Sequence, residues 1–261
     1  LPGPSHGFIP KVGGDGEGLA AEALPAEFFA VEGGAVPTLL TAFFELGPLG
    51  RIDQQIPLTS FAVEVGHLGG PETFGQMVWA EAQRRGWEQA SDTQALGDGA
   101  AWIWNLAADH FYDSHQTVDW YHGVEHLAAM ARLLKGDGTP AAKRWLNAQK
   151  TILFEGHALR IALHLGAEAE ARPELAADLE REAGYFHKHH RRMNYQQMRE
   201  DGWAIGSGMV ESAAKQFKAR FTGPGMRWSR PGAERLIPVR AAIMSHRFDP
   251  LWQQAYNSPQ N

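Results

Sequence analysis

The chain contains no cysteine among its 261 residues. This absence excludes disulfide bonds, thiolate zinc sites and a cysteine nucleophile, and it fits a reducing cytoplasm, where we expect the protein to reside. No stretch approaches the ~18 uninterrupted apolar residues of a membrane helix, so we expect a soluble protein with no membrane partner. Hydrophobic residues make up 44% and charged residues 21% of the chain. That composition excludes a disordered chain, a collagen and a coiled coil.

The first residues are rich in glycine and proline. Residues 1–18 contain six glycines and three prolines and show no apolar periodicity. No continuous apolar core follows a basic start, so the segment does not have the pattern of a signal peptide. We interpret residues 1–25 as a flexible linker left by truncation.

The net charge of −6 is distributed unevenly. Residues 187–247 contain twelve lysines and arginines against four acidic residues, which gives this segment +8 and the remainder −14. A basic end on an acidic body indicates a polyanionic partner, with nucleic acid as the leading candidate. A solvated helical surface is the alternative.

The hydrophobic pattern predicts strands first and helices later. Three runs rich in Phe and Val predict an antiparallel meander at 26–32, 37–46 and 58–65. Helices are then expected at 71–85, 100–111 and 120–134, with strands at 93–96 and 116–119. Residues 141–199 read as entirely helical, and further helices are expected at 209–221 and 233–246.

This order predicts an α/β fold, with a mixed sheet and helices on its faces. It is the element order of the ribonuclease-H-like fold with a helical insertion before the last core helix. We accordingly divide the chain after its linker into a first core part at 26–135, the insertion at 136–202 and a C-terminal part at 203–261. The last part would hold the final core helix and a basic, DNA-contacting region.

Asp98 stands between two glycines at the end of a predicted strand. Ligands of open α/β sheets bind at the carboxyl ends of the strands, and flanking glycines allow a ligand to approach closely. Asp98 is therefore a candidate site residue. The alternative is an aspartate that caps the helix expected from Ala100.

A denser pattern follows the next predicted strand, which ends at Asp119. His122, Glu125 and His126 lie three and four residues apart, so they share one face of the following helix. One hypothesis is an H-x-x-E-H zinc site with His122 and His126 as ligands and Glu125 as base. Another is an Asp-x-x-His pair that supports a nearby carboxylate site. A polar helix face capped by Asp119 is the third.

Glu211 begins a predicted helix after a Gly-Ser-Gly turn, and Lys215 and Lys218 follow near the same face. A carboxylate here can hold a metal ion while the lysines hold phosphates. The alternative is a helix-stabilising Glu–Lys pair worth ~0.3–0.5 kcal/mol.

Arginines and a tryptophan then stand in or beside a Gly/Pro-rich loop. This pattern suits phosphate contact with base stacking, or a loop whose Trp228 packs back on the body. The candidate DNA contacts are Lys215, Lys218, Arg220, Arg227, Trp228 and Arg230.

Three blocks occur together in one order: LGDGAAWIWNLAADHF, VDWYHGVEHL, and GWAIGSGMVES followed by GPGMRWSRPGAERL. Together they resemble bacterial insertion-sequence transposases of the DDE class, nearest the ISKra type, from about Phe28 to Trp252. The resemblance implies a ribonuclease-H-like core in which three carboxylates bind two Mg²⁺ or Mn²⁺ ions that cut and rejoin DNA. Asp98 matches the second carboxylate and Glu211 the third. Asp119 and His122 match an auxiliary Asp-x-x-His.

The first carboxylate departs from the family pattern. The family has an aspartate in a Val-Asp-Gly setting, whereas this chain has Glu32 there. The extra methylene displaces the carboxylate by ~1 Å, and a shift of that size can cost ~10²-fold in rate. The expected metal ligands are thus Glu32, Asp98 and Glu211, which we expect to converge.

Transposon ends and target DNA are the partners that the resemblance implies, with self-association left open. The family's N-terminal DNA-binding region is not found in this sequence. Two other functions are weighed beside the transposase. One is a non-catalytic, DNA-binding relic of such an enzyme, and the other is a zinc hydrolase built on His122, Glu125 and His126.

Overall fold

The computed structural model describes residues 39–42, 45–46, 65–90, 92–206, 208–222 and 224–257. Of 39–42, 45–46 and 208–213, only the course of the backbone is described. Glu32 and the strand predicted at 26–32 lie outside the described residues, so the placement of the first expected carboxylate stays a prediction.

Two small sheets contain the described strands. β4 (Thr93–Gly97) pairs in parallel with β5 (His115–Val118) and antiparallel with β2 (Glu45–Leu46). The order in this sheet is β2-β4-β5. β1 (Leu39–Ala42) and β3 (Val65–Leu68) form a separate antiparallel pair. The sheets and the surrounding helices agree with the predicted α/β class.

The expected three-stranded meander is found only in part. The run at 37–46 is divided between β1 and β2, and β3 begins at Val65, where the third predicted strand was expected to end. Within the described residues, β4 has β5 on one side and the antiparallel β2 on the other. Apolar runs predict extended backbone, but strand ends and partners depend on packing between strands, which a single sequence does not reveal.

Three helices follow the strands β3, β4 and β5 in the chain, and the first of them packs on β3. α1 (Pro71–Arg84) starts with proline in its first turn and buries Phe74 and Val78 on one face, as the spacing predicts. α2 (Ala101–His110) makes the crossover that two parallel strands require. α3 (Trp120–Lys135) follows β5 directly.

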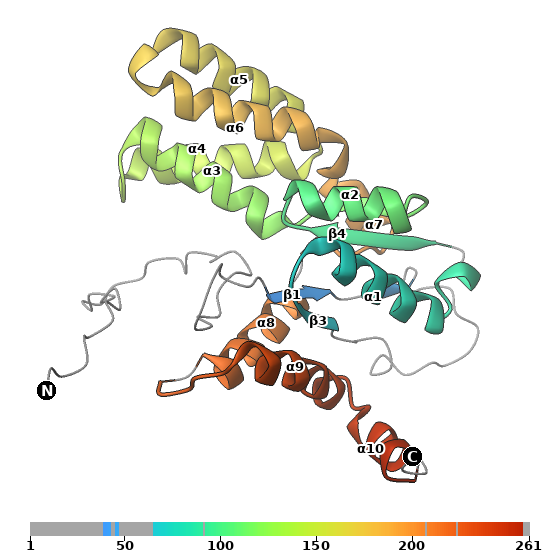
Figure 1. Ribbon diagram of the computed structural model, residues 1–261. Helices are drawn as coiled ribbons and strands as arrows, with labels where there is room; N and C mark the ends of the chain where they lie inside the picture. Colours follow the sequence, from blue (N-terminus) through green and yellow to red (C-terminus); the bar gives the residue numbers. More distant parts are fainter. Residues whose placement is uncertain are drawn as a thin grey trace, which may run out of the picture.

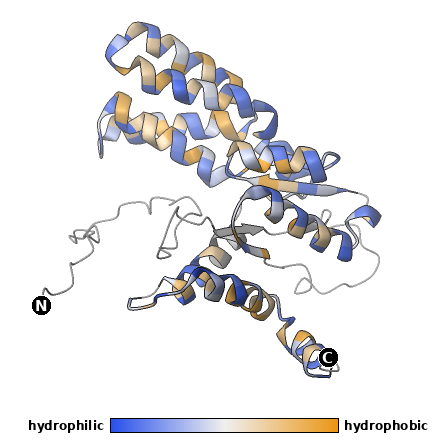
Figure 2. Ribbon diagram, in the orientation of Figure 1, coloured by the Kyte–Doolittle hydropathy of each residue, from blue (hydrophilic) through white to orange (hydrophobic). Residues whose placement is uncertain are grey.

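The segment predicted to be entirely helical is so. It consists of α4 (Pro140–Phe154), α5 (Ala158–Ala171), α6 (Ala176–His189) and the short α7 (Tyr195–Glu200), with short 3-10 turns around α6. In Figure 1, α5 and α6 form the outermost layer, and α3 and α4 lie between them and the sheet. Each of these helices carries both hydrophobic and hydrophilic residues (Figure 2), as expected of helices that bury one side.

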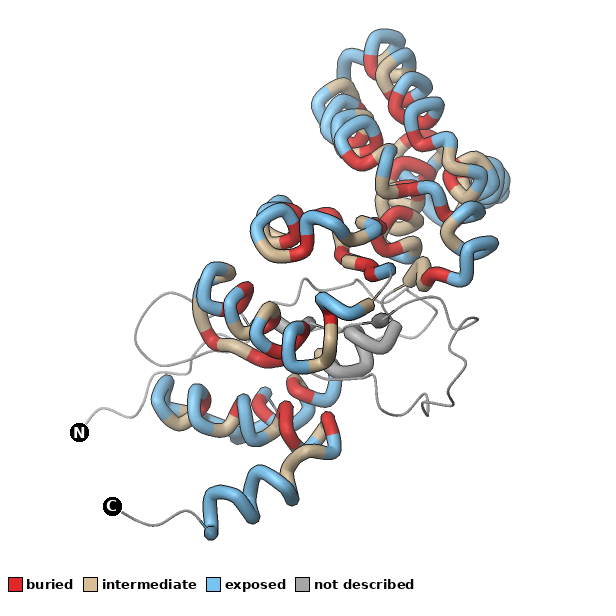
Figure 3. Tube along the Cα trace, turned by 90° about the vertical axis from the view of Figure 1, so that its right-hand side faces the viewer, coloured by how far each residue is buried: buried red, intermediate tan, exposed pale blue. Residues whose placement is uncertain are grey.

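One hydrophobic core extends from the parallel strands into the helical insertion. Val118 of β5 and Leu127 of α3 belong to the same buried cluster as Leu153, Ile161 and Phe186 of α4, α5 and α6. Buried residues accordingly line the inner sides of these helices in Figure 3. The insertion is therefore packed as a continuation of the core, and its helices are held at fixed positions relative to the carboxyl ends of β4 and β5.

The C-terminal helices pack on the other sheet. α8 (Gly208–Phe221) and α9 (Arg230–Met244) place Phe217, Phe221 and Ile237 against Leu68 of β3. The last helix, α10 (Phe248–Asn257), was not predicted, and none of its ten residues is buried (Figure 3). No helix in the described ranges has both the length and the apolar character needed to cross a membrane.

Candidate functional site

Asp98 and Asp119 lie at matching positions on neighbouring strands. Gly97, the last residue of β4, is the register partner of Val118, the last residue of β5, and the two strands run in parallel. The backbone N–H of Asp119 donates to the carbonyl of Gly97 at 2.7 Å. The two aspartates therefore leave the sheet at the same carboxyl edge, as strand-end residues at a ligand site do.

Asp119 has the capping role that was considered as an alternative, whereas α2 begins after the N-cap Ala100 and Asp98 only accepts from the backbone ahead of that helix. Oδ1 of Asp98 accepts the N–H of Ala100 at 2.8 Å, and Oδ1 of Asp119 accepts the N–H of His122 at 2.9 Å. Asp119 is thus the N-cap of α3 and is itself buried. A carboxylate has about four lone-pair positions, so a cap of this kind and a metal contact are compatible.

The chain that leads into α8 is fixed against the same edge. The N–H of Trp120 donates to the carbonyl of Ile205 at 2.8 Å, and the side-chain amide of Gln94 donates to the carbonyl of Ala204 at 2.8 Å. A Cβ built on Gly206 would lie 3.8 Å from Oδ2 of Asp119. The approach to α8 is therefore beside Asp119.

Glu211 belongs to the first turns of α8, which begins at Gly208. Its side chain is outside the described part of the structure. Its distance from the strand edge and the position of its carboxyl group therefore stay a prediction.

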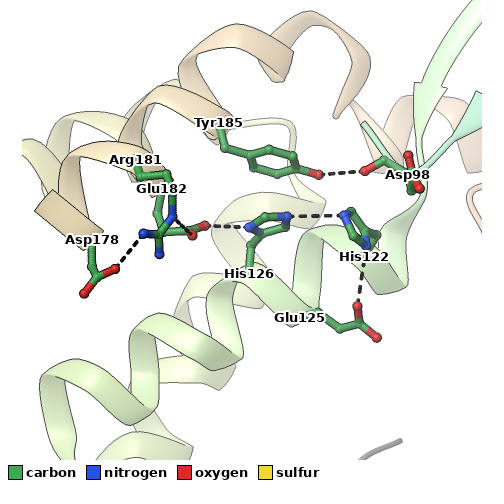
Figure 4. Close-up of polar contacts among 8 residues, drawn as sticks. All are labelled: Asp98, His122, Glu125, His126, Asp178, Arg181, Glu182 and Tyr185. Carbon is green, nitrogen blue, oxygen red and sulfur yellow. Dashed lines mark hydrogen bonds and ion pairs between the residues drawn. The ribbon is translucent and has the colours of Figure 1, made fainter. Parts of the chain in front are cut away.

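Two histidines of α3 face one another next to this edge (Figure 4). Nε2 of His122 and Nε2 of His126 are 3.3 Å apart. Nδ1 of His126 lies 2.5 Å from a carboxylate oxygen of Glu182 on α6, and Nδ1 of His122 lies 3.4 Å from one of Glu125. The H-x-x-E-H face predicted from the sequence is therefore present, with an additional carboxylate from a distant helix.

Tyr185 of α6 covers the histidine pair and reaches the strand edge. Its ring stacks on that of His126 with centroids 3.7 Å apart and an angle of 19°. Its hydroxyl donates to the carbonyl of Asp98 at 3.4 Å (Figure 4). One helix of the insertion thus supplies two side chains, Glu182 and Tyr185, to the surroundings of Asp98.

Negative charge accumulates around Tyr185. Burial raises the pKa of its phenol far above the ordinary value, and the charges of Asp98, Glu182, Asp119 and Glu125 raise it further. The phenol is therefore neutral and a hydrogen-bond donor at physiological pH. The same four carboxylates make this region favourable for a cation.

Glu182 is ionised although it is buried. Burial alone would raise the pKa of its carboxyl, but the hydrogen bond and charge of His126, together with Arg181, outweigh that effect and lower it. Arg181 is itself held by Asp178 at 2.6 Å. An ionised, buried carboxylate of this kind fixes the orientation of the imidazole that it contacts.

Sequence reasoning did not identify Glu182 or Tyr185. They lie on an amphipathic helix of ordinary composition, 56 residues or more after the histidines they contact. Their three-residue spacing shows only that they share a helix face. That face lies at the candidate site because α6 packs across α3, and no local sequence pattern carries that information.

The oxygen donors suit a hard divalent cation. Asp98 and Asp119 place carboxylates at one edge, and Mg²⁺ and Mn²⁺ take such ligands together with water. Among the residues whose side chains are described, no group of three or more His, Asp or Glu is arranged to hold a metal ion. The side chain of Glu211 and the whole of Glu32, two of the three expected ligands, lie outside the described residues.

The candidate DNA contacts lie on or near α8 and the start of α9. Lys215, Arg220, Arg227 and Arg230 are exposed and Lys218 is half-buried. Arg230 pairs with Glu234 at 2.8 Å, which reduces the charge it presents.

Trp228 packs back on the body, which is the second of the two alternatives considered for it. Its indole N–H donates to the carbonyl of Phe221 at 3.0 Å, and its ring lies against that of Phe221. The guanidinium of Arg220 lies 5.9 Å from the indole ring. The indole of Trp228 is half-buried, and the guanidinium of Arg220 lies beside it.

Comparisons with protein-family models, with curated proteins and with solved structures each return no match to this chain.

Proposed function

We propose that this protein is a DDE-class transposase, which cleaves and transfers DNA strands at a carboxylate site on a ribonuclease-H-like core. The observation that carries the proposal is the in-register exit of Asp98 and Asp119 from two parallel strands, with the entry to α8 fixed beside Asp119. The first two sequence blocks that resemble the family thus lie together at one edge of the sheet, with residues 204–206 of the third block beside them.

Each block has a role in this proposal. Glu32, Asp98 and Glu211 hold the metal ions, which would stabilise the attacking and leaving oxygens of an in-line phosphoryl displacement. Asp119 caps α3 and thereby fixes the backbone of His122 next to the site. Lys215 and Lys218 stand four and seven residues after Glu211 on α8, where they would bind the phosphates that flank the cleaved bond.

DNA is the partner, in the form of transposon ends and a target duplex, and the cytoplasm is the compartment in which we place the reaction. The basic segment 187–247 would supply the affinity for DNA through contacts of its lysines and arginines with phosphates. Such contacts do not depend on the DNA sequence. A non-catalytic relic would keep this binding and lose the cleavage.

The test is nicking of supercoiled plasmid in Mg²⁺ or Mn²⁺. Asp98→Asn keeps an oxygen that can accept the N–H of Ala100 but loses the charge that holds a metal, so we expect nicking to be lost and stability to be unchanged. Asp92→Asn, an exposed aspartate outside the site, is the matched control. Nicking by Asp98→Asn at the wild-type rate would contradict the proposed function.

A second set of variants in the same experiment tests the first carboxylate, Glu32. Glu32→Asp shortens the side chain to the length that the family pattern has, so we expect metal-dependent nicking to appear or increase. Asp98→Asn in the same chain should remove that gain. DNA binding without nicking in both wild type and Glu32→Asp would favour the relic.

A further inference from the structure

His122 and His126 place two imidazole nitrogens close together on one face of α3. Their Nε2 atoms are 3.3 Å apart and their rings are nearly perpendicular, at 82°. The two Nε2 atoms are within hydrogen-bond distance, and they are also close enough to bind one common ion.

The opposite nitrogen of each ring faces a carboxylate. Glu182 lies 2.5 Å from Nδ1 of His126, and Glu125 lies 3.4 Å from Nδ1 of His122. In the neutral form of each ring, a carboxylate at Nδ1 favours the tautomer with the proton on that nitrogen and the lone pair on Nε2. Two Nε2 lone pairs at this distance can bind one cation in place of a shared proton.

The separation matches the bite of a tetrahedral metal ion. Zinc–nitrogen bonds of about 2.0–2.1 Å at a tetrahedral angle place two ligand nitrogens about 3.3–3.4 Å apart. We propose that His122 and His126 bind one borderline transition-metal ion of the Zn²⁺ class through their Nε2 atoms. This site is separate from the hard-cation site at the strand edge, because nitrogen ligands select a different class of metal.

The surroundings hold the two rings in this arrangement before any ion binds. Glu182 is buried and fixes the ring of His126 at one end, while Tyr185 stacks on its face. Carboxylate–histidine pairs of this kind orient ligands and make them more basic in metal sites. Water or a bound phosphate would complete the coordination, since the described residues place no third His, Asp or Glu in a metal-holding group with this pair.

This ion would not make the protein a peptidase of the H-x-x-E-H type. The carboxylate of Glu125 lies at Nδ1 of His122, on the side of the ring away from Nε2. A general base must reach a water bound to the ion, and Glu125 instead orients one of the ligands.

The experiment titrates the full chain with Co²⁺, whose visible absorption reports nitrogen ligation and tetrahedral geometry, and then displaces it with Zn²⁺. We expect one ion per chain. His122→Ala and His126→Ala should each abolish the tetrahedral spectrum, and Glu182→Gln should weaken affinity about 10–100-fold. His187→Ala, an exposed histidine on α6, should bind as wild type.

The outcomes separate this site from the proposed function, because no DNA is present and nicking is not measured. His122 is the more exposed of the two, so His122→Ala provides a test even if His126→Ala fails to fold. Absence of Co²⁺ and Zn²⁺ binding, or a spectrum unchanged in His122→Ala, would overturn the proposal. A nitrogen NMR spectrum that shows one proton shared between the two Nε2 atoms in the presence of Zn²⁺ would do the same.

Discussion

Glu182 of α6 accepts a 2.5 Å hydrogen bond from His126 of α3, and the two residues are 56 positions apart. The contact joins the helical insertion to the helix that begins at Asp119. Tyr185, one turn further along α6, makes a second connection through its hydroxyl to the carbonyl of Asp98. The helical insertion therefore contacts the strand edge through side chains of α6 and helps to hold the residues there in place.

We expect Glu182→Ala to destabilise the protein. The change leaves the Nδ1 proton of His126 without its carboxylate, and an unsatisfied, partly buried donor costs on the order of 1–3 kcal/mol. Urea unfolding measures this loss. Glu180→Ala, an exposed glutamate two residues earlier on the same helix, should change the free energy of unfolding by less than about 0.5 kcal/mol. Equal effects of the two variants would show that the His126 contact is not stabilising.

The second prediction concerns Gly99, directly after Asp98. Its φ is +99°, and a Cβ added there would lie 2.9 Å from Cε2 of Tyr185. Gly99→Ala should therefore cost the roughly 1–2 kcal/mol of a left-handed backbone plus about 1–3 kcal/mol of overpacking against the ring.

The control for this change is Gly138→Ala. Gly138 also has a positive φ, of +67°, but an added Cβ would meet nothing within 4 Å. The difference between the two variants in thermal or urea unfolding isolates the contact with Tyr185. If Gly99→Ala is no more destabilising than Gly138→Ala, the ring of Tyr185 does not pack tightly over the strand edge.

The helices were the most predictable part of the fold. The spacing of Phe74 and Val78 fixes the buried face of α1, and Asp119 followed by a helical pattern marks the start of α3. The strands were harder to predict, because the ends of β1 and β3 depend on their pairing with each other. α10 was not predicted, although Pro250 lies in its first turn, where a helix accepts proline.

The candidate site was predictable only where its residues follow strands or share a helix. Asp98, Asp119 and His122 could be found because strand ends and helix spacing are local features. Glu182 could not, because its contact with His126 is a product of how α6 packs against α3. A single sequence shows which residues share a face of each helix but not which faces meet.

DNA affinity should fall steeply with salt if the basic segment binds phosphates, because each neutralised phosphate releases condensed counterions. Arg227→Glu and Arg230→Glu should weaken binding on all sequences alike and reduce the salt slope by about 1 per contact removed. Fluorescence anisotropy on duplexes of unrelated sequence measures both effects. Arg144→Glu, the same charge reversal at an exposed position on α4, is the control. Binding that is independent of salt, or absent at low salt, would contradict a polyanionic partner.

The last prediction concerns the pH dependence of stability. His189 is buried between Trp104 and Tyr185, and its Nδ1 has no hydrogen-bond partner among the described residues. Burial, followed by the positive charges of Arg192, Lys188 and His126, lowers the pKa of His189 to about 4, against a smaller opposing effect of Asp98. The folded protein therefore resists protonation of this imidazole.

The unfolded chain takes up that proton near its ordinary pKa of about 6.5. The stability tied to neutral His189 is thus fully present above pH ~6.5. It decreases as the pH falls from there to about 4, with a slope approaching ~1.4 kcal/mol per pH unit. His189→Leu removes the titrating group, so the free energy of unfolding of the variant should depend less on pH in this window. His187→Leu, at an exposed position on the same helix, should keep the wild-type slope. Parallel pH profiles for wild type and His189→Leu would show that the buried imidazole is not held neutral by the fold.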